Sequence, residues 1–266
     1  MTYCIGLYTQ AGLVMLADTR TNAGVDNIST FRKLKVWEKP GDRVISLMSA
    51  GNLAVSQTVI GLLDEGLLFT EEDRAMMGAD APADPEQVQT PLTVPTMFQA
   101  AMLVGRAVRA VFHMDGEALE RQDSPFNVSM ILGGQVAGRR MRLFNIYAAG
   151  NFIEASEDTP FFQIGEHKYG KPILDRAMSY DLELHDAVKL SLLSMDSTMR
   201  SNLSVGMPLD LMVYQRDSLK VGFQRRIEQG DEYYVHLQQS WSDSLRGAYT
   251  RLPQPEWMNP DLFNGK

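Results

Sequence analysis

Apolar residues open the chain in two short runs that predict a β-hairpin. The first run spans Tyr3–Tyr8 and the second spans Gly12–Ala17, with Thr9–Ala11 between them. Neither run alternates strictly between apolar and polar residues, which is typical of strands buried on both faces. The protein is therefore predicted to begin with a pair of core strands.

Further runs of apolar residues, separated by turn-forming residues, predict five more strands. These strands cover residues 33–37, 43–49, 127–132, 140–147 and 209–215, with turns expected at residues 39–42 and at Gly133-Gly134.

Three segments space their apolar residues three or four positions apart, as one face of a helix does. The first begins after Asn52, a suitable N-cap residue, and ends near Gly66. The other two cover residues 96–120 and 184–199. Residues 76–96 are rich in proline and polar side chains, which predicts a loop between two helices.

This order of elements predicts an α+β fold. Most strands lie close enough in sequence to form hairpins, which favours antiparallel sheets over a doubly wound parallel sheet. We expect a four-layer αββα sandwich in which helices flank two antiparallel sheets. Residues 1–266 are predicted to form one domain, with a C-terminal helix and tail at about 231–266 that pack on the body or cover a neighbouring subunit.

The charge balance argues against two classes of partner. The chain has 25 Lys and Arg residues against 33 Asp and Glu residues, a formal net charge of −8. A molecule with this excess of acid repels phosphate backbones and anionic membrane surfaces. We therefore expect neither nucleic acid nor a membrane as its partner.

Cysteine content and hydropathy predict a cytoplasmic protein. Cys4 is the only cysteine, which excludes an internal disulfide framework and a multi-cysteine metal site. The N-terminus lacks the basic and apolar regions of a signal peptide. The most apolar internal segment, residues 97–114, carries Arg106 and Arg109, which argues against a membrane span.

Metal and nucleotide chemistry find little support in the sequence. The four histidines have no ligand spacing, so no metal and no cofactor are expected. Residues 165–171 fit the pattern G-x-x-x-x-G-K, but Pro172 stands where Ser or Thr would bind magnesium. The bulky residues inside this segment also disfavour a phosphate-binding loop.

The second residue offers a different chemistry. Removal of Met1 would leave Thr2 with an α-amine and a hydroxyl on the same residue. An α-amine, whose pKa is about 7.7–8.0, is able to take the proton of a hydroxyl that acts as a nucleophile. Many proteins begin with Met-Thr, so the interpretation depends on Thr2 starting a buried strand and on the motifs downstream.

Those motifs resemble the proteasome β-subunit family of N-terminal-nucleophile hydrolases. Leu16–Arg20 and Phe31–Leu34 follow Thr2 at the spacing of that family, and the start Met-Thr-Tyr-Cys with residues 18–33 is most similar to the bacterial Anbu (ancestral β-subunit) group. The resemblance covers most of the chain and extends to Ser49–Gly51, Val128–Gly134, Ile146–Gly150 and Asp196. It implies the αββα sandwich of N-terminal-nucleophile hydrolases.

The resemblance also implies roles for four residues near the N-terminus. Thr2 would be the nucleophile, and its α-amine would accept the proton directly or through water. Lys33 would lower the pKa of the hydroxyl, and Asp18 would keep Lys33 charged and oriented. The backbone N–H of Gly51 would stabilise the oxyanion of the reaction.

A supporting group is implied near the end of the last predicted helix of the body. Asp196 matches the late aspartate of the family, which usually has a serine three residues after it. That serine is missing here, so either Ser197 or Ser201 is expected to take its place. The family's substrate-pocket positions map near Thr21, Phe31 and Ser49.

Three functions follow as hypotheses. The first is a threonine-type peptidase or amidohydrolase that works through an acyl ester on Thr2. The second passes the same acyl group to an amine, as a ligase or transpeptidase does, and the third is a non-catalytic, ring-forming scaffold. The family implies a homo-oligomer, either a ring or an open helical assembly. Folded protein substrates would need a separate ATP-dependent partner, because this chain contains no ATPase module.

Overall fold

A computed structural model of the chain describes residues 1–22, 28–81, 84, 86–122, 124, 126–255 and 257–258. The chain divides into two compact units, Met1–Gln229 and Gly230–Lys266.

One antiparallel sheet of the larger unit contains the predicted N-terminal hairpin. Its two strands pair with Cys4 opposite Ala17, and all of their residues are buried. Because both faces of the hairpin are covered, its residues do not alternate between apolar and polar. The strand order is β10-β1-β2-β11-β12. The strands are β1 (Tyr3–Tyr8), β2 (Gly12–Asp18), β10 (Phe161–Gly165), β11 (Leu209–Gln215) and β12 (Phe223–Ile227).

The second antiparallel sheet lies against the first and has the order β5-β6-β7-β8-β9. It consists of β5 (Leu34–Lys39), β6 (Arg43–Gly51), β7 (Val128–Val136), β8 (Arg142–Ile146) and β9 (Phe152–Glu154). A separate ribbon, formed by β3 (Arg20–Asn22) and β4 (Ile28–Thr30), connects the first sheet to the second along the chain.

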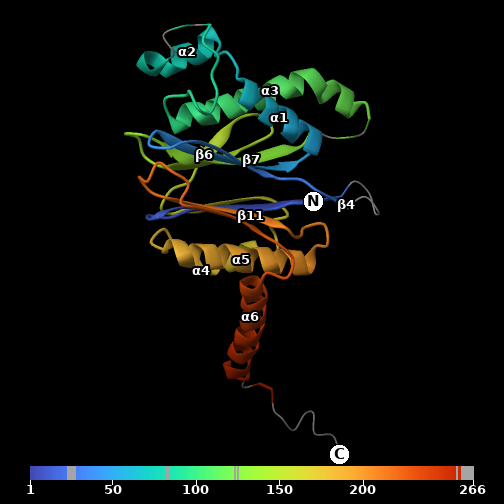
Figure 1. Cartoon of the computed structure of the whole chain (residues 1–266). Helices are drawn as coiled ribbons and strands as arrows, with labels where there is room; N and C mark the ends of the chain where they lie inside the picture. Colours follow the sequence, from blue (N-terminus) through green and yellow to red (C-terminus); the bar gives the residue numbers. More distant parts are fainter. Residues whose placement is uncertain are drawn as a thin grey trace, which may run out of the picture. The chain divides into compact units, whose positions relative to one another are not determined.

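Helices cover the outer faces of the two sheets (Figure 1). α1 (Leu53–Glu65) and α3 (Met97–Glu120) pack on the second sheet. α5 (Leu184–Ser201) packs on the first sheet, and α4 (Lys171–Ala177) packs against α5. The predicted α+β class and four-layer αββα sandwich are confirmed.

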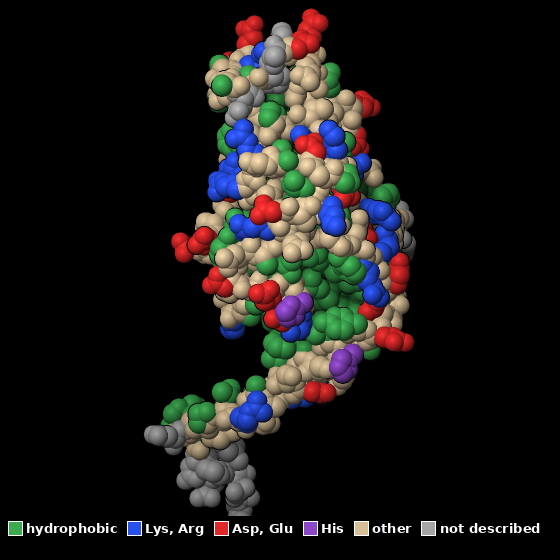
Figure 2. Space-filling view, turned by 60° about the vertical axis from the view of Figure 1, so that its left-hand side comes forward, with side chains coloured by type: hydrophobic (Ala, Val, Ile, Leu, Met, Phe, Trp, Pro, Cys, Tyr) green, Lys and Arg blue, Asp and Glu red, His purple; other side chains and the backbone are tan. Residues whose placement is uncertain are grey.

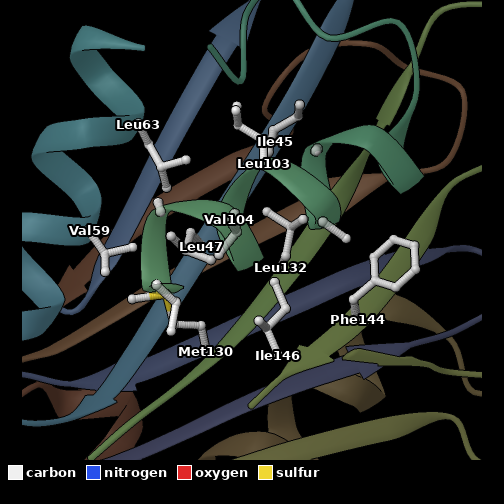
Figure 3. Packing of buried hydrophobic residues seen from close by; sticks show 14 of the residues in the cluster. Ile45, Leu47, Val59, Leu63, Leu103, Val104, Met130, Leu132, Phe144 and Ile146 are labelled. Atoms are coloured by element: carbon white, nitrogen blue, oxygen red, sulfur yellow. The ribbon is translucent and has the colours of Figure 1, made fainter. Parts of the chain in front are cut away.

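Two apolar clusters hold these layers together. One lies between the two sheets and includes Leu13, Met15 and Ile131. The other lies between the second sheet and its helices (Figure 3). Its central residues come from α1, α3 and three strands: Val59, Leu63, Leu103, Val104, Ile45, Leu47, Met130, Leu132, Phe144 and Ile146.

The turn predicted at Gly133-Gly134 is wrong, because β7 continues through both residues. A Cβ atom on Gly133 would lie 3.0 Å from a side-chain carbon of Leu143, and one on Gly134 would lie 2.1 Å from the carbonyl oxygen of Val44. The two glycines therefore allow neighbouring groups to approach closely, and they do not reverse the chain.

The loop predicted at residues 76–96 starts too early, because helical residues extend to Asp80. The structure has α2 (Glu71–Met77) followed by the short 3₁₀ helix η1 (Gly78–Asp80). Thr70 and Asp73 cap α2 reciprocally through their side chains. Such a capping box stabilises a helix that is too short to show a clear apolar period. Residues 82, 83 and 85 of the predicted loop lie outside the described residues.

The smaller unit contains α6 (Glu232–Arg251), which the side chain of Asp231 caps by accepting a hydrogen bond from the N–H of Tyr234. Residues 256 and 259–266 of the expected C-terminal tail lie outside the described residues.

Acidic and basic side chains are interspersed over the face shown in Figure 2. Within the part of the chain that the structure describes, no helix combines the length and the apolar character that a membrane crossing requires. The same residues contain no cluster of three or more His, Cys, Asp or Glu side chains able to hold a metal ion.

Candidate active site

Thr2 lies at a cavity beside the start of β1. Its side chain is largely buried, and its carbonyl oxygen accepts a hydrogen bond from the N–H of Glu166 at 2.7 Å. The cavity has a volume of 770 Å³. Its lining includes Met1, Thr2, Lys33, Gly51 and Glu166. The structure thus brings three of the predicted catalytic residues, Thr2, Lys33 and Gly51, together at one cavity.

Asp18 and Lys33 form a buried ion pair behind this cavity. Asp18 ends β2 and Lys33 directly precedes β5, so two different strands position the charges. The Lys33 ammonium donates hydrogen bonds to Asp18 Oδ1 and to the Arg20 carbonyl, both at 2.7 Å. Backbone N–H groups of Tyr3 and Gly206 also donate to the Asp18 carboxylate, at 3.0 and 3.3 Å. The carboxylate is therefore held by groups from three parts of the chain.

The pair lies in an environment where charge is costly. Asp18 is fully buried, and 5% of the Lys33 side chain is exposed. Burial raises the pKa of Asp18, and the Lys33 ammonium and the two N–H donors oppose that shift. An ammonium has three protons, and two of those on Lys33 are directed at Asp18 and Arg20. The third is left for the cavity that Lys33 lines.

The terminal amine responds to the same charges. Burial and the Lys33 ammonium lower the pKa of the Met1 α-amine, while Asp18 and Glu166 oppose that decrease. An amine at this end of β1 is therefore shifted toward its neutral, proton-accepting form.

Gly51 ends β6 at the rim of the cavity. Its φ of +114° favours glycine, and a Cβ atom there would lie 2.2 Å from the carbonyl oxygen of Asn127. On the same strand, Ser49 donates its N–H to the Lys33 carbonyl at 3.1 Å. Because N–H directions alternate along a strand, the Gly51 N–H points to the same side as that of Ser49. β5 begins at Leu34 and does not extend beside Gly51, so the Gly51 N–H is directed toward the cavity that this residue lines.

The predicted supporting residues are not among the described residues that line the cavity. Asp196 accepts a hydrogen bond from Arg200 Nε at 2.9 Å within α5, and Ser197 donates to the Leu193 carbonyl at 3.1 Å. Ser201 is exposed and is the last residue of α5. The described residues that line the cavity include none of Asp196, Ser197 and Ser201.

Two of the three predicted pocket positions line the cavity, namely Thr21 and Ser49. Phe31 does not belong to the described lining, and 37% of it is exposed. Its N–H donates a hydrogen bond to the Thr19 carbonyl at 2.9 Å.

Glu166 is a cavity residue that sequence reasoning missed. Its carboxylate is 10% exposed and accepts a hydrogen bond from Asn202 Nδ2 at 3.0 Å. Tyr3 pairs with Gly165 across β1 and β10, so Thr2 and Glu166 come next in the same register. The available signal was the apolar run Phe161–Ile164, which reads as a strand that Glu166 follows by two residues.

The same register explains the pattern G-x-x-x-x-G-K. Its first glycine, Gly165, has a φ of +81°, and a Cβ atom there would lie 1.9 Å from the Thr2 carbonyl oxygen. A Cβ atom on Gly170 would lie 2.2 Å from the hydroxyl of Tyr3. Both glycines are therefore required for packing on the first strand, which accounts for the motif without a phosphate.

The chain is similar to proteasome subunits in sequence and in structure. A family model described as "Proteasome subunit" matches residues 97–213. The Anbu (Gly-1) mutant from Hyphomicrobium sp. strain MC1 is 49% identical, with a TM-score of 0.84, over 96% of this chain and 100% of that one. Anbu from Yersinia bercovieri is 44% identical, with a TM-score of 0.83, over 97% of this chain and 100% of that one.

A third similar structure is described as a helical assembly of the Anbu complex from Pseudomonas aeruginosa. It is 42% identical, with a TM-score of 0.83, over 97% of this chain and 100% of that one. The comparison with curated proteins gave no match.

Proposed function

The chain belongs to the Anbu (ancestral β-subunit) group of the proteasome-subunit family, and on this premise we propose that it is a threonine-type peptidase or amidohydrolase. The working protein begins at Thr2, after removal of Met1. The observation that carries the proposal is that Thr2, Lys33 and Gly51 line one cavity, with Asp18 buried behind Lys33.

The first step forms an ester. The α-amine of Thr2 takes the proton of the Thr2 hydroxyl, directly or through water, and Oγ1 attacks the carbonyl carbon of the substrate. The Lys33 ammonium stabilises the negative charge that develops on Oγ1. The protonated α-amine then gives its proton to the leaving nitrogen as the C–N bond breaks, which leaves the acyl group on Thr2.

Gly51 supports the same step from the other side of the carbonyl. As Oγ1 attacks, the carbonyl oxygen becomes an oxyanion, and the Gly51 N–H donates a hydrogen bond to it. The loss of one such donor costs about 2.7–4 kcal/mol of transition-state stabilisation in an enzyme of this type. Water then attacks the ester, and the α-amine accepts its proton and passes it to Oγ1 when the acid leaves.

Asp18 acts through Lys33. An isolated, buried lysine tends to lose its proton, whereas a carboxylate at 2.7 Å favours the ammonium form. Asp18 is therefore a positioning residue that keeps the charge of Lys33 and fixes its direction.

We further propose that the protein works in the cytoplasm as a homo-oligomer. The homo-oligomer is supported by the similar chain from Pseudomonas aeruginosa, whose structure is described as a helical assembly. The substrate class is a peptide or another amide. Folded proteins would have to be unfolded by a separate ATP-dependent partner before they reached a cavity of this size.

The nucleophile is tested by covalent labelling. The protein is incubated with a small sulfonyl fluoride, which loses fluoride when Thr2 Oγ1 bonds to sulfur, and the product is read by intact mass and peptide mapping. Labelling is expected on Thr2 of protein that lacks Met1. Thr2→Ser should keep the labelling, and Thr2→Ala should lose it while its oligomeric state stays unchanged.

The alternatives give different results. Unlabelled wild-type protein that is assembled and free of Met1 would contradict the enzymatic proposal and favour a scaffold. If the nucleophile is confirmed, peptide amides are incubated with and without methylamine. Free acids are expected as the products in both cases, whereas N-methyl amides as the main product would establish acyl transfer instead.

A further inference from the structure

We propose that Glu166 is a positioning residue for the α-amine of Thr2, and that its carboxylate accepts a hydrogen bond from this amine in the mature protein. The inference rests on the proposed function, in which this amine is the base. The Glu166 carboxylate does not belong to the set of Thr2, Asp18 and Lys33. It follows β10, a strand that the motifs of the sequence resemblance did not include.

The backbone brings the two residues together. The Glu166 N–H donates to the Thr2 carbonyl at 2.7 Å, and Thr2 comes next to Tyr3 in the register that pairs Tyr3 with Gly165. In an antiparallel pair, the N–H and C=O of one residue point to the same side. The nitrogen of Thr2 is therefore directed toward the strand that carries Glu166.

The Glu166 carboxylate has a hydrogen-bond donor, but the described contacts give it no buried cation as a partner. Asn202, which follows α5, donates to Oε2 at 3.0 Å and so fixes one oxygen. The nearest cation in the described contacts is Lys168, whose Nζ lies 3.9 Å from Oε1 and whose side chain is 73% exposed. A carboxylate that is 10% exposed gains little from such a pair, because water screens the lysine. The ammonium form of the Thr2 amine supplies the missing buried partner.

Three charged groups act on the α-amine of Met1, which occupies this end of the chain before Met1 is removed. Lys33 and Asp18 lie at strand ends and Glu166 follows β10, while Lys168 lies 3.9 Å from Glu166. Burial and Lys33 lower the pKa of the terminal amine, while the two carboxylates oppose this. Glu166 therefore offsets part of the decrease that Lys33 causes in the pKa of the amine, so that Lys33 can stabilise the nucleophile while the amine still accepts a proton.

The test titrates the amine itself. Protein that begins at Thr2 is prepared by cleaving a removable N-terminal fusion, and its α-amine is acetylated with acetic anhydride between pH 5 and 9. Mass spectrometry of the N-terminal peptide gives the midpoint pH of the reaction. Glu166→Gln is expected to lower this midpoint by about one pH unit, because it removes a negative charge close to the amine.

Two further variants make the result specific. Glu166→Asp keeps the charge and is expected to restore the midpoint toward that of the wild type. Glu157→Gln is the matched control, because Glu157 is exposed and lies before β10, whereas Glu166 follows it. At that end of β10 the Pro160 carbonyl accepts a hydrogen bond from the N–H of Tyr8, the last residue of β1, so Glu157 belongs to the end of the pair away from Thr2. This control variant should leave the midpoint unchanged.

An unchanged midpoint in Glu166→Gln, with normal assembly, would overturn the inference. A uniform loss of reactivity at every pH would also overturn it, because that result indicates a merely structural role. The pH midpoint depends on the protonation of the amine, so it is read independently of sulfonyl labelling of the hydroxyl. Failure of the proposed nucleophile and failure of the Glu166 inference are thus distinguishable.

Discussion

Two buried aspartates of this protein each pair with a basic side chain, and of the two basic partners Lys33 lines the cavity while Arg200 is absent from its described lining. Asp18 pairs with Lys33 at 2.7 Å, and both side chains are buried, with 0% and 5% exposed. Asp196 pairs with Arg200 at 2.9 Å, but 59% of the Arg200 side chain is exposed. The first pair is closed off from water on both sides, whereas the second reaches the surface.

The difference lies in what each pair connects. Lys33 is fifteen positions from Asp18, and the Asp18 carboxylate also joins the backbone at Tyr3 and at Gly206. Asp196 and Arg200 are neighbours on one turn of α5. The hydrogen bonds of Asp18 thus join segments that are distant in the sequence, and they do so next to Thr2, the residue that precedes β1.

The largest effect that separates the two pairs is expected in stability. Asp18→Asn leaves the Lys33 ammonium buried without a countercharge, which should lower the free energy of unfolding by about 3–5 kcal/mol. Asp196→Asn leaves Arg200, which is 59% exposed, able to extend into water, and its cost should be smaller, about 1–2 kcal/mol. Urea unfolding of both variants at pH 7 measures the difference, and equal losses would contradict this account of the comparison.

The next effect concerns reactivity. Lys33→Met should slow sulfonyl labelling of Thr2 by about 100- to 1,000-fold, since it removes the positive charge that stabilises the negative charge developing on Thr2 Oγ1. Arg200→Met, the matched substitution at the other pair, should leave the rate of labelling within about threefold of the wild type.

A double variant separates loss of folding from loss of chemistry. Asp18→Asn combined with Lys33→Met removes both buried charges, which is far less costly than breaking the pair. This protein should recover most of its stability while remaining slow to label. Recovery of both properties together would show that the pair is structural.

The residues on the cavity side of this comparison were named by the family resemblance, and the strand pattern explains why they lie close together. Thr2 directly precedes a buried strand, and Asp18, Lys33 and Gly51 each lie within one residue of a strand end. Once the strands pair in antiparallel order, their ends meet at one edge of the sandwich. The spacing of these residues was therefore informative before any contact was known.

The sequence is a poor guide where position depends on a helix turn or on one short strand. On α5, a shift of one residue rotates a side chain by about 100°, so the match of Asp196 to a motif does not fix which way it points. β10 is a strand of five residues, and its role beside β1 depends on pairing across more than 150 positions. Glu166 and Asn202 come together at Thr2 only through that pairing.

Tyr3 links the two regions and gives the smallest of the expected effects. Its hydroxyl lies 2.7 Å from that of Ser194 on α5, and the Tyr3 side chain is fully buried. Burial raises the pKa of Tyr3 from 10.0 to about 12. The unfolded chain therefore loses this proton at a lower pH than the folded protein does.

The sign of the pH dependence follows from this order. Below pH 10 the contribution of Tyr3 to stability is fully present, and between pH 10 and 12 it falls by about 1.4 kcal/mol per pH unit, because only the unfolded state is ionised there. Urea unfolding at pH 9, 10 and 11 should show this loss in the wild type and a smaller one in Tyr3→Phe. Tyr249→Phe, at a tyrosine that is 76% exposed, is the control and should keep the wild-type slope. If Tyr3→Phe keeps the wild-type dependence of stability on pH, the Tyr3 hydroxyl ionises as readily in the folded protein as in the unfolded chain. Its contact with Ser194 would then hold β1 and α5 together less tightly than the distance indicates.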